Sequence, residues 1–193
     1  MRVLAINGSP RKKGNTDIVL EWVLDELRAR KAKVKKVMAA KLNISGCIEC
    51  FACQKVDDKP ACAIDDDMQD LYKKILKADL IILATPVFCW GMTAQLKAVL
   101  DRCYALFKFN KDPYVCLAAG KKIALVVTAG GGLDDGPKAC QAQVNSFAQF
   151  AGLESAGALL VTDAKSPKDT LNDKEMRKNA VRFGQRLAEL IEE

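Results

Sequence analysis

The sequence predicts an α/β fold of three layers, in which a five-stranded parallel sheet of order 2-1-3-4-5 lies between two layers of helices. Five short apolar runs recur at regular intervals along the 193 residues. Between them, apolar residues recur at the i, i+3, i+4 spacing of one buried helix face. Strands that alternate with helices in this way favour a parallel sheet with right-handed crossovers.

The expected strands are short and largely β-branched: Val3–Ile6, Val34–Met38, Leu80–Ala84, Ile123–Thr128 and Ala158–Thr162. Five apolar stripes mark the expected helices: Ile18, Trp22, Val23 and Leu27; Met68, Leu71, Ile75 and Leu76; Leu96, Val99, Leu100 and Cys103; Val144, Phe147 and Ala151; Ala180, Gly184, Leu187 and Ile191. The polar stretch 161–172 is expected to be a loop before the last helix. No repeat or linker interrupts the alternation, so we expect one domain over residues 1–193.

Composition narrows the class of protein. Half of the residues are apolar, which is enough for a buried core. No apolar run approaches the ~18 residues that a membrane-spanning helix needs, and the first residues lack the regions of a signal peptide. We therefore expect a cytoplasmic protein with no membrane partner.

The formal net charge is +6, and much of the excess lies in one segment without acidic residues: Arg28, Arg30, Lys31, Lys33, Lys35, Lys36 and Lys41. One interpretation is a solvated helix end, where cations suit the helix dipole. The other is a docking patch for an acidic partner or nucleic acid. The lack of interleaved aromatic residues and of nucleic-acid motifs favours the helix end, so we expect no nucleic-acid partner.

The loop after the first expected strand, residues 7–16, is typical of a phosphate-binding site. Its backbone N–H groups, its hydroxyls and the positive end of the next helix can all bind an anion. Five residues separate Gly8 from Gly14, which excludes a Walker A motif, and the G-x-G-x-x-G of dinucleotide-binding folds is absent. A terminal phosphate monoester, such as that of FMN, remains as the ligand. A turn that binds nothing is the alternative.

Two further loops should meet this one, because the carboxyl ends of parallel strands share one edge of the sheet. The first, Thr85–Gly91, carries Phe88 and Trp90, whose flat rings suit stacking against a flavin. The second, Thr128–Gly132, is rich in glycine, which lets the backbone approach a ligand closely. Three such loops around one crevice indicate a flavin site.

Histidine is absent, so the chemistry rests on a cofactor, on cysteines, or on both. The chain has eight cysteines: Cys47, Cys50, Cys53, Cys62, Cys89, Cys103, Cys116 and Cys140. In a cytosolic chain of this size, thiols or metal ligands are expected rather than a disulfide framework. We expect Cys89 to be a packing residue near the ring, and Cys103, Cys116 and Cys140 to be core or surface thiols.

The chain resembles the NADPH-dependent FMN reductase family of the flavodoxin-like superfamily over most of its first 135 residues. The matching residues are Gly8-Ser9-Pro10-Arg11, Gly14-Asn15-Thr16, Thr85 to Gly91, Gln95-Leu96-Lys97 and Leu100-Asp101-Arg102. The resemblance implies that FMN binds through its phosphate to the first loop, at Ser9, Arg11, Lys12, Gly14, Asn15 and Thr16. It implies that the isoalloxazine lies against Pro86, Val87, Phe88, Cys89, Trp90, Gly91, Thr128, Ala129, Gly130 and Gly131. One departure is Phe88, where many relatives carry a tyrosine.

This resemblance implies an oxidoreductase in which NAD(P)H or a ferredoxin reduces FMN. The electrons then pass to a small acceptor such as a quinone, an azo or nitro compound, free flavin or oxygen. No side chain is assigned as catalytic, since the flavin carries the redox chemistry. Assembly as a homodimer or homotetramer is also implied. Two alternatives stay open: a flavodoxin-like electron carrier, although such carriers are usually acidic, and a cysteine-based redox or metal sensor.

The chain resembles one subgroup further, the iron–sulfur flavoproteins, through Cys47, Cys50, Cys53 and Cys62. Three cysteines spaced three residues apart, with a fourth nearby, resemble the ligands of a [4Fe–4S] cluster in bacterial ferredoxins. Eight residues separate Cys53 from Cys62, slightly more than is usual in the subgroup. A cluster, free thiols and a labile disulfide are all open interpretations. We expect this loop to lie at the same edge of the sheet as the flavin, and Asp65–Asp67 to cap a helix rather than to bind metal.

Overall fold

A computed structural model describes residues 1–190, so Ile191, predicted on the last helix, lies outside the described residues. Five parallel strands form one sheet in the order β2-β1-β3-β6-β7. Their bounds are β1 Arg2–Asn7, β2 Lys33–Met38, β3 Leu80–Pro86, β6 Lys122–Thr128 and β7 Glu154–Val161. Counted along the chain, these strands have the order 2-1-3-4-5, and the predicted flavodoxin-like fold is confirmed.

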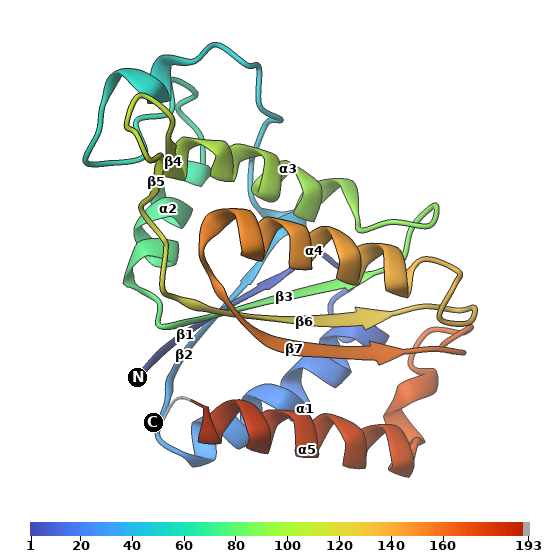
Figure 1. The fold of residues 1–193 in the computed structure, drawn as a ribbon. Coiled ribbons are helices and arrows are strands. Elements are labelled where there is room, and N and C mark those ends of the chain that lie inside the picture. Colours follow the sequence, from blue (N-terminus) through green and yellow to red (C-terminus); the bar gives the residue numbers. More distant parts are fainter. Residues whose placement is uncertain (191–193) are drawn as a thin grey trace.

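Helices cover both faces of this sheet (Figure 1). On one face lie α1 (Asn15–Ala29) and α5 (Lys174–Glu189), and on the other lie α2 (Met68–Lys77), α3 (Ala94–Arg102) and α4 (Pro137–Ala151). Alternate strand residues supply the two cores, as a pleated strand requires. In β1, for example, Leu4 and Ile6 pack in the core under α2, α3 and α4, whereas Val3 and Ala5 pack against α1 and α5.

Two of the predicted elements differ in detail. Strand β7 begins at Glu154, four residues before the predicted run, because its first residues are small or polar yet still pair with β6. In α1, Ile18 and Trp22 are only half-buried, and the buried stripe runs through Val19, Leu20, Val23, Leu24 and Leu27. Helix α1 packs on the sheet and on α5 together, and this turns the buried face away from the predicted stripe.

The predicted interpretation of the basic segment is wrong for most of its residues. Only Arg28 and Arg30 lie at the end of α1, whereas Lys33, Lys35 and Lys36 lie on the edge strand β2. Lysines on an edge strand oppose pairing with a strand of another molecule. Within the described residues, no helix is long and apolar enough to span a membrane.

Short elements between the helices carry no periodic pattern and were not predicted. They are the 3₁₀ turns η1 Ala39–Lys41, η2 Ala52–Lys55, η3 Cys103–Leu106 and η4 Asp169–Asn172, and the hairpin strands β4 Phe107–Lys108 and β5 Val115–Cys116. The hairpin is tied to the cysteine-bearing loop, because Gln54 Nε2 donates to the carbonyl of Phe107 at 2.9 Å and Gln54 Oε1 accepts from the amide of Phe109.

Candidate functional site

Four loops at the carboxyl edge of the sheet enclose one crevice. Its first part, about 130 Å³ in volume, is lined by Ser9, Pro10, Arg11, Gly14, Asn15, Thr16, Pro86, Val87, Phe88, Thr128, Ala129, Gly130, Ala164 and Pro167. Its second part, about 390 Å³, is lined by Val87, Cys89, Trp90, Ala129, Gly130, Gly131 and Asp135. Val87, Ala129 and Gly130 line both parts, so the two parts adjoin each other. We call the two parts together the crevice.

The crevice brings together most of the predicted cofactor residues. Lys12 and Gly91 do not line it. Sequence reasoning missed Asp135, whose Oδ2 accepts from the amide of Gly132 at 2.8 Å. It also missed that the predicted loop after β7 lines the crevice, through Ala164 and Pro167. The shared edge of parallel strands could have found that loop, because it follows the carboxyl end of the last strand.

A buried carboxylate, Asp17, holds the 7–16 loop in shape. It accepts from Asn7 Nδ2 at 2.9 Å, from the amide of Lys13 at 2.9 Å and from Lys36 Nζ at 2.7 Å. The Lys13 bond fixes a residue with φ of 60°, which is left-handed backbone. Burial alone would raise the pKa of Asp17, but these donors together hold it below its ordinary value. The loop is therefore pre-organised by charge and hydrogen bonds.

The N-terminus of α1 opens into the crevice without a side-chain cap, because Gly14 is its N-cap residue. The first N–H groups of a helix have no acceptor within the helix. Together with the dipole, they form a site for an anion. The Arg11 side chain stands beside this helix end, exposed to solvent.

Two side chains that were predicted to bind the phosphate, those of Asn15 and Thr16, instead form hydrogen bonds with other residues of the protein. Asn15 Nδ2 donates to the carbonyl of Ser166 at 2.8 Å, and Asn15 Oδ1 accepts from the hydroxyl of Thr170 at 3.2 Å. The hydroxyls of Thr16 and Thr128 lie 2.6 Å apart. These bonds tie α1 to β6 and to the loop after β7. The backbone amides of Asn15 and Thr16 thus become the stronger candidates for an anion.

Glycine is required where the first loop crosses α3. A Cβ at Gly8 would lie 2.6 Å from Thr93 Oγ1 and 2.7 Å from Leu96 Cβ. The same Thr93 hydroxyl donates to the carbonyl of Gly8 at 2.9 Å and caps α3 through the amide of Leu96. The contact joins the 7–16 loop to the start of α3.

The rim of the crevice carries a tight turn whose two central residues are in the left-handed region. Phe88 and Gly91 exchange two backbone hydrogen bonds, and Cys89 and Trp90 between them have φ of 45° and 58°. Left-handed backbone costs roughly 1–3 kcal/mol for residues other than glycine and gathers at functional sites. The turn leaves Trp90 70% exposed beside the crevice, so its ring is free to meet a ligand.

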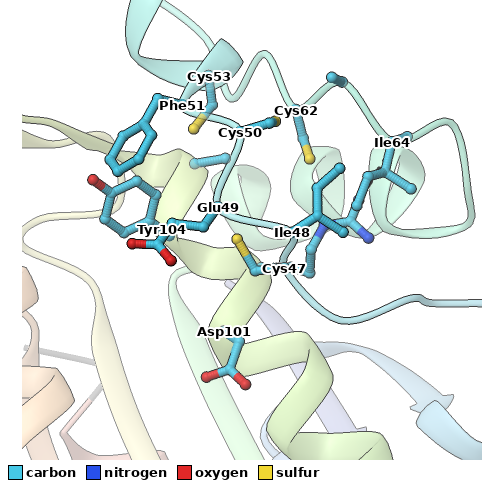
Figure 2. A pocket seen from close by; sticks show the side chains of 13 residues that line it. Cys47, Ile48, Glu49, Cys50, Phe51, Cys53, Cys62, Ile64, Asp101 and Tyr104 are labelled. Carbon is cyan, nitrogen blue, oxygen red and sulfur yellow. Dashed lines mark hydrogen bonds between the residues drawn. The ribbon is translucent and has the colours of Figure 1, made fainter.

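The four clustered cysteines line a second, separate pocket of about 310 Å³, which we call the cysteine pocket. It is lined by Cys47, Ile48, Glu49, Cys50, Phe51, Cys53, Cys62, Ala63, Ile64, Asp101, Arg102, Tyr104 and Ala105 (Figure 2). In Figure 2 the sulfur atoms of Cys47, Cys53 and Cys62 point into the space that the loop encloses. Among residues 1–190, no three cysteine or acidic side chains lie close enough together to hold a metal ion.

The cysteine pocket does not lie at the edge of the sheet where the sequence predicted it. Helix α3 begins beside the crevice at Thr93 and ends at Arg102, which lines the cysteine pocket. A helix of nine residues spans about 14 Å. The loop 42–67 is long enough to leave the carboxyl edge and reach the far end of α3 (Figure 1).

Of the other four thiols, three lie in the core, and Cys89, predicted to be a packing residue, is exposed instead. Cys103, Cys116 and Cys140 are buried, and burial raises the pKa of Cys103 to about 12. A thiol with so high a pKa is unreactive. Cys89 is exposed on the rim of the crevice.

The predicted helix cap at Asp65–Asp67 is only partly right. Asp67 is the N-cap residue of α2 without a side-chain cap bond, and Asp66 Oδ1 accepts from the amide of Met68 at 3.0 Å. Asp66 has a second role that the sequence did not indicate, a buried ion pair with Arg102 at 2.7 Å. The two residues are 36 positions apart, so no local pattern could have paired them.

The fold defines a flavodoxin-like α/β protein with a crevice at the carboxyl edge of its sheet. A profile of the NADPH-dependent FMN reductase family matches residues 1–165. An iron–sulfur flavoprotein of Methanosarcina thermophila is 30% identical over 157 residues, which are 81% of this chain and 78% of the relative. One from Methanocaldococcus jannaschii is 27% identical over 198 residues, covering 99% and 97% of the two chains.

Among solved structures, the FMN-dependent NADH-azoreductase from Bacillus anthracis in complex with FMN matches with a TM-score of 0.73. The identity is 14%, over 97% of this chain and 100% of that one, which shows a shared fold. The chain belongs to the NADPH-dependent FMN reductase family. It is a flavoprotein oxidoreductase.

Proposed function

We propose that this protein binds FMN in the crevice, takes electrons from NAD(P)H or a ferredoxin, and passes them to a small acceptor. The acceptor classes are quinones, azo or nitro compounds, free flavin and oxygen. The observation that carries the proposal is the crevice itself. One hollow joins an uncapped helix N-terminus, a cationic side chain and a rim of aromatic residues.

The two parts of the crevice suit the two ends of FMN. The phosphate end would meet Arg11, the hydroxyl of Ser9 and the first amides of α1, which supply positive charge and donors. The ring end would lie against Phe88 and Trp90 on one side and the backbone of the 128–131 segment on the other. Bound there, FMN supplies hydride and electron chemistry. The residues bind it, orient it and limit its contact with water.

We also propose that Cys47, Cys50, Cys53 and Cys62 hold a [4Fe–4S] cluster. All four line one pocket, and that pocket has a buried arginine in its wall, which suits an anionic group. Within residues 1–190 no three possible ligands lie close enough together to hold a metal ion, so the proposal requires the loop to draw the four sulfur atoms together. Exposed apolar residues surround the pocket, with Ile48 67% and Phe51 51% exposed. A cluster there would be accessible to a one-electron carrier such as ferredoxin.

The test is to purify the protein without oxygen and to measure FMN, iron and sulfide per chain. We expect one FMN, and about four iron atoms with four sulfides if the cluster assignment is right. NADH, NADPH and reduced ferredoxin are then compared as donors with a quinone and an azo dye as acceptors. Flavin that is reduced and never turns over with any acceptor would indicate a pure electron carrier and would contradict the proposed enzyme.

Two cysteine variants separate the cofactors. Cys50→Ser should lose iron and keep FMN, because its side chain lines only the cysteine pocket. Cys89→Ser is the matched control, since Cys89 is an exposed thiol outside that pocket, and it should keep its iron. Equal iron in both variants would contradict the cluster assignment and leave the FMN assignment intact.

A further inference from the structure

The wall of the cysteine pocket contains a buried arginine with one free donor. The Arg102 side chain is 0% exposed. Its Nη1 donates to Asp66 Oδ2 at 2.7 Å and to the carbonyl of Ser45 at 2.9 Å, and its Nη2 donates to Asp66 Oδ1 at 3.0 Å. Its Nε–H is buried and has no hydrogen-bond partner within the described residues. The Nη2 atom also donates to the carbonyl of Ile64 at 3.4 Å. Four of the five N–H groups of the guanidinium thus have an acceptor within the described residues, and the Nε–H has none.

A buried donor without an acceptor costs roughly 1–3 kcal/mol, so this one calls for an explanation. The cysteines of the pocket supply a candidate acceptor. The sulfur atoms of a thiolate-bound group would give the free Nε–H its missing acceptor.

A second buried cation stands on another side of the same loop. Lys108 is 0% exposed, and its Nζ donates to the carbonyls of Cys53 at 2.9 Å and Lys59 at 2.8 Å. Within residues 1–190 no carboxylate lies within ion-pair distance of it. The acids that act on it, Asp57 and Asp58, do so only over a longer range. A buried charge without a counter-ion is costly.

The two cations differ in how their charge is balanced, and the lining of the pocket also contains two acidic residues, Glu49 and Asp101. Asp101 pairs with Lys97. Asp66 balances Arg102, and nothing in direct contact balances Lys108. A [4Fe–4S] group with four thiolates is an anion, and it gains one more negative charge when it takes up one electron. A buried cation close to such a group, as Lys108 is through the carbonyl of Cys53, therefore favours its reduced form.

We propose that Arg102 and Lys108 raise the reduction potential of the cluster, Arg102 by donating its Nε–H to a sulfur atom and Lys108 by its unpaired charge. This inference rests on the proposed cluster. Both residues act through the cluster, as tuning and positioning residues, and neither is a ligand. Net charge and hydrogen bonds to sulfur are two of the properties that set iron–sulfur potentials.

A purely structural role makes a different prediction. Arg102 and Lys108 also fasten the loop to the end of α3 and to β4. If fastening were their whole role, every variant that loosens the loop would shift the potential in the same direction. Under the proposal, removing a positive charge or a donor lowers the potential, and removing the negative charge of Asp66 raises it.

The experiment measures the midpoint potential of the cluster in the intact, anaerobically purified protein, by titration with dithionite and redox mediators. Arg102→Lys keeps the charge and loses the Nε–H. Lys108→Gln loses the charge and keeps two N–H donors for the two carbonyls. Asp66→Asn removes the counter-charge of Arg102. Lys121→Gln is the matched control, because Lys121 also donates to a backbone carbonyl, that of Ala78, and lies outside the cysteine pocket.

We expect a lower potential in Arg102→Lys and Lys108→Gln, a higher one in Asp66→Asn and no change in Lys121→Gln. Unchanged potentials, or a fall in all three pocket variants, would overturn the inference while the cluster stands. If either Arg102→Lys or Lys108→Gln loses its iron, the potential of the other variant tests the inference. Loss of iron in both, with FMN retained, would overturn the inference in favour of a structural role. A wild-type protein without iron and sulfide would overturn the proposed cluster as well.

Discussion

The Nζ atom of Lys36 on β2 lies 2.7 Å from Oδ1 of Asp17 in the first turns of α1. The same ammonium also pairs with Glu21, one turn further along the helix. The carboxylate of Asp17 in turn accepts from Asn7 and Lys13, which belong to the loop at the mouth of the crevice. Through Asp17, a lysine on the edge strand thus stabilises the shape of the 7–16 loop.

Replacing Asp17 with asparagine should destabilise the protein and weaken FMN binding together. The amide side chain would keep the shape of the carboxylate but could not accept from three donors, one of them charged. We expect a loss of about 3 kcal/mol in the free energy of unfolding near pH 7, measured by urea denaturation. Normal stability with normal FMN affinity would show that the loop does not depend on this carboxylate.

The same variant predicts a dependence on pH. The folded pKa of Asp17 lies below its ordinary value of 3.8. The contribution of the Asp17 carboxylate to the free energy of unfolding is therefore complete above about pH 4, and it is lost as the pH falls through the folded pKa. The difference in unfolding free energy between wild type and Asp17→Asn should be constant from about pH 5 to 7 and should shrink below pH 3.8. A difference that grows on acidification would contradict the ion-paired state.

Replacing Arg11 with alanine should weaken FMN binding about 10- to 100-fold, the value of one charge-assisted hydrogen bond. Lys12→Ala is the matched control, since Lys12 is an exposed cation of the same loop that does not line the crevice. Fluorescence titration with FMN and with riboflavin distinguishes the loss of a phosphate contact from a general loss of flavin binding. Riboflavin lacks the phosphate, so Arg11→Ala should leave its affinity unchanged. An equal loss for both flavins would place the phosphate elsewhere.

Replacing Trp90 with alanine should weaken the binding of both flavins, whereas Arg11→Ala should weaken the binding of FMN alone. Its ring is 70% exposed, so the free energy of unfolding should change by no more than about 0.5 kcal/mol. Because the ring is proposed to contact the isoalloxazine, FMN and riboflavin should weaken by a similar factor. Leu171→Ala, an exposed apolar residue outside the crevice, should change neither affinity. Unchanged flavin affinity in Trp90→Ala would remove Trp90 from the ring site.

Replacing Gly8 with alanine should destabilise the fold by about 1–3 kcal/mol through overpacking. The new methyl group would press on Thr93 Oγ1 and Leu96 Cβ and push the loop away from α3. Gly46→Ala is the control, because nothing lies within 4 Å of a Cβ at that position. Thermal unfolding compares the two. Equal melting temperatures would contradict the close contact at Gly8.

The sheet and the crevice could be predicted because both follow from local patterns. An apolar strand, a loop of small residues and an amphipathic helix recur in order, and the carboxyl ends of parallel strands share one edge. Asp135 and the 164–167 loop were missed only because that rule was not extended to the whole of each loop. Such contributions are within reach of sequence reasoning.

Other features depend on contacts that no local pattern encodes. The ion pair of Asp66 with Arg102 joins residues 36 positions apart, and the carbonyl partners of Lys108 lie 49 and 55 positions away. The position of the cysteine pocket was predicted wrongly because the 42–67 loop was assumed to stay where β2 ends. A loop of this length can cross the end of a neighbouring helix, and here it packs at the end of α3.

The most direct test of the account is a crystal structure of the protein with FMN bound. It should place the phosphate at the N-terminus of α1, within hydrogen-bond distance of Arg11 and of the amides of Asn15 and Thr16, with the ring beside Phe88 and Trp90. A flavin bound with its phosphate away from the 7–16 loop would contradict the central claim, because that loop would then have no anion to hold.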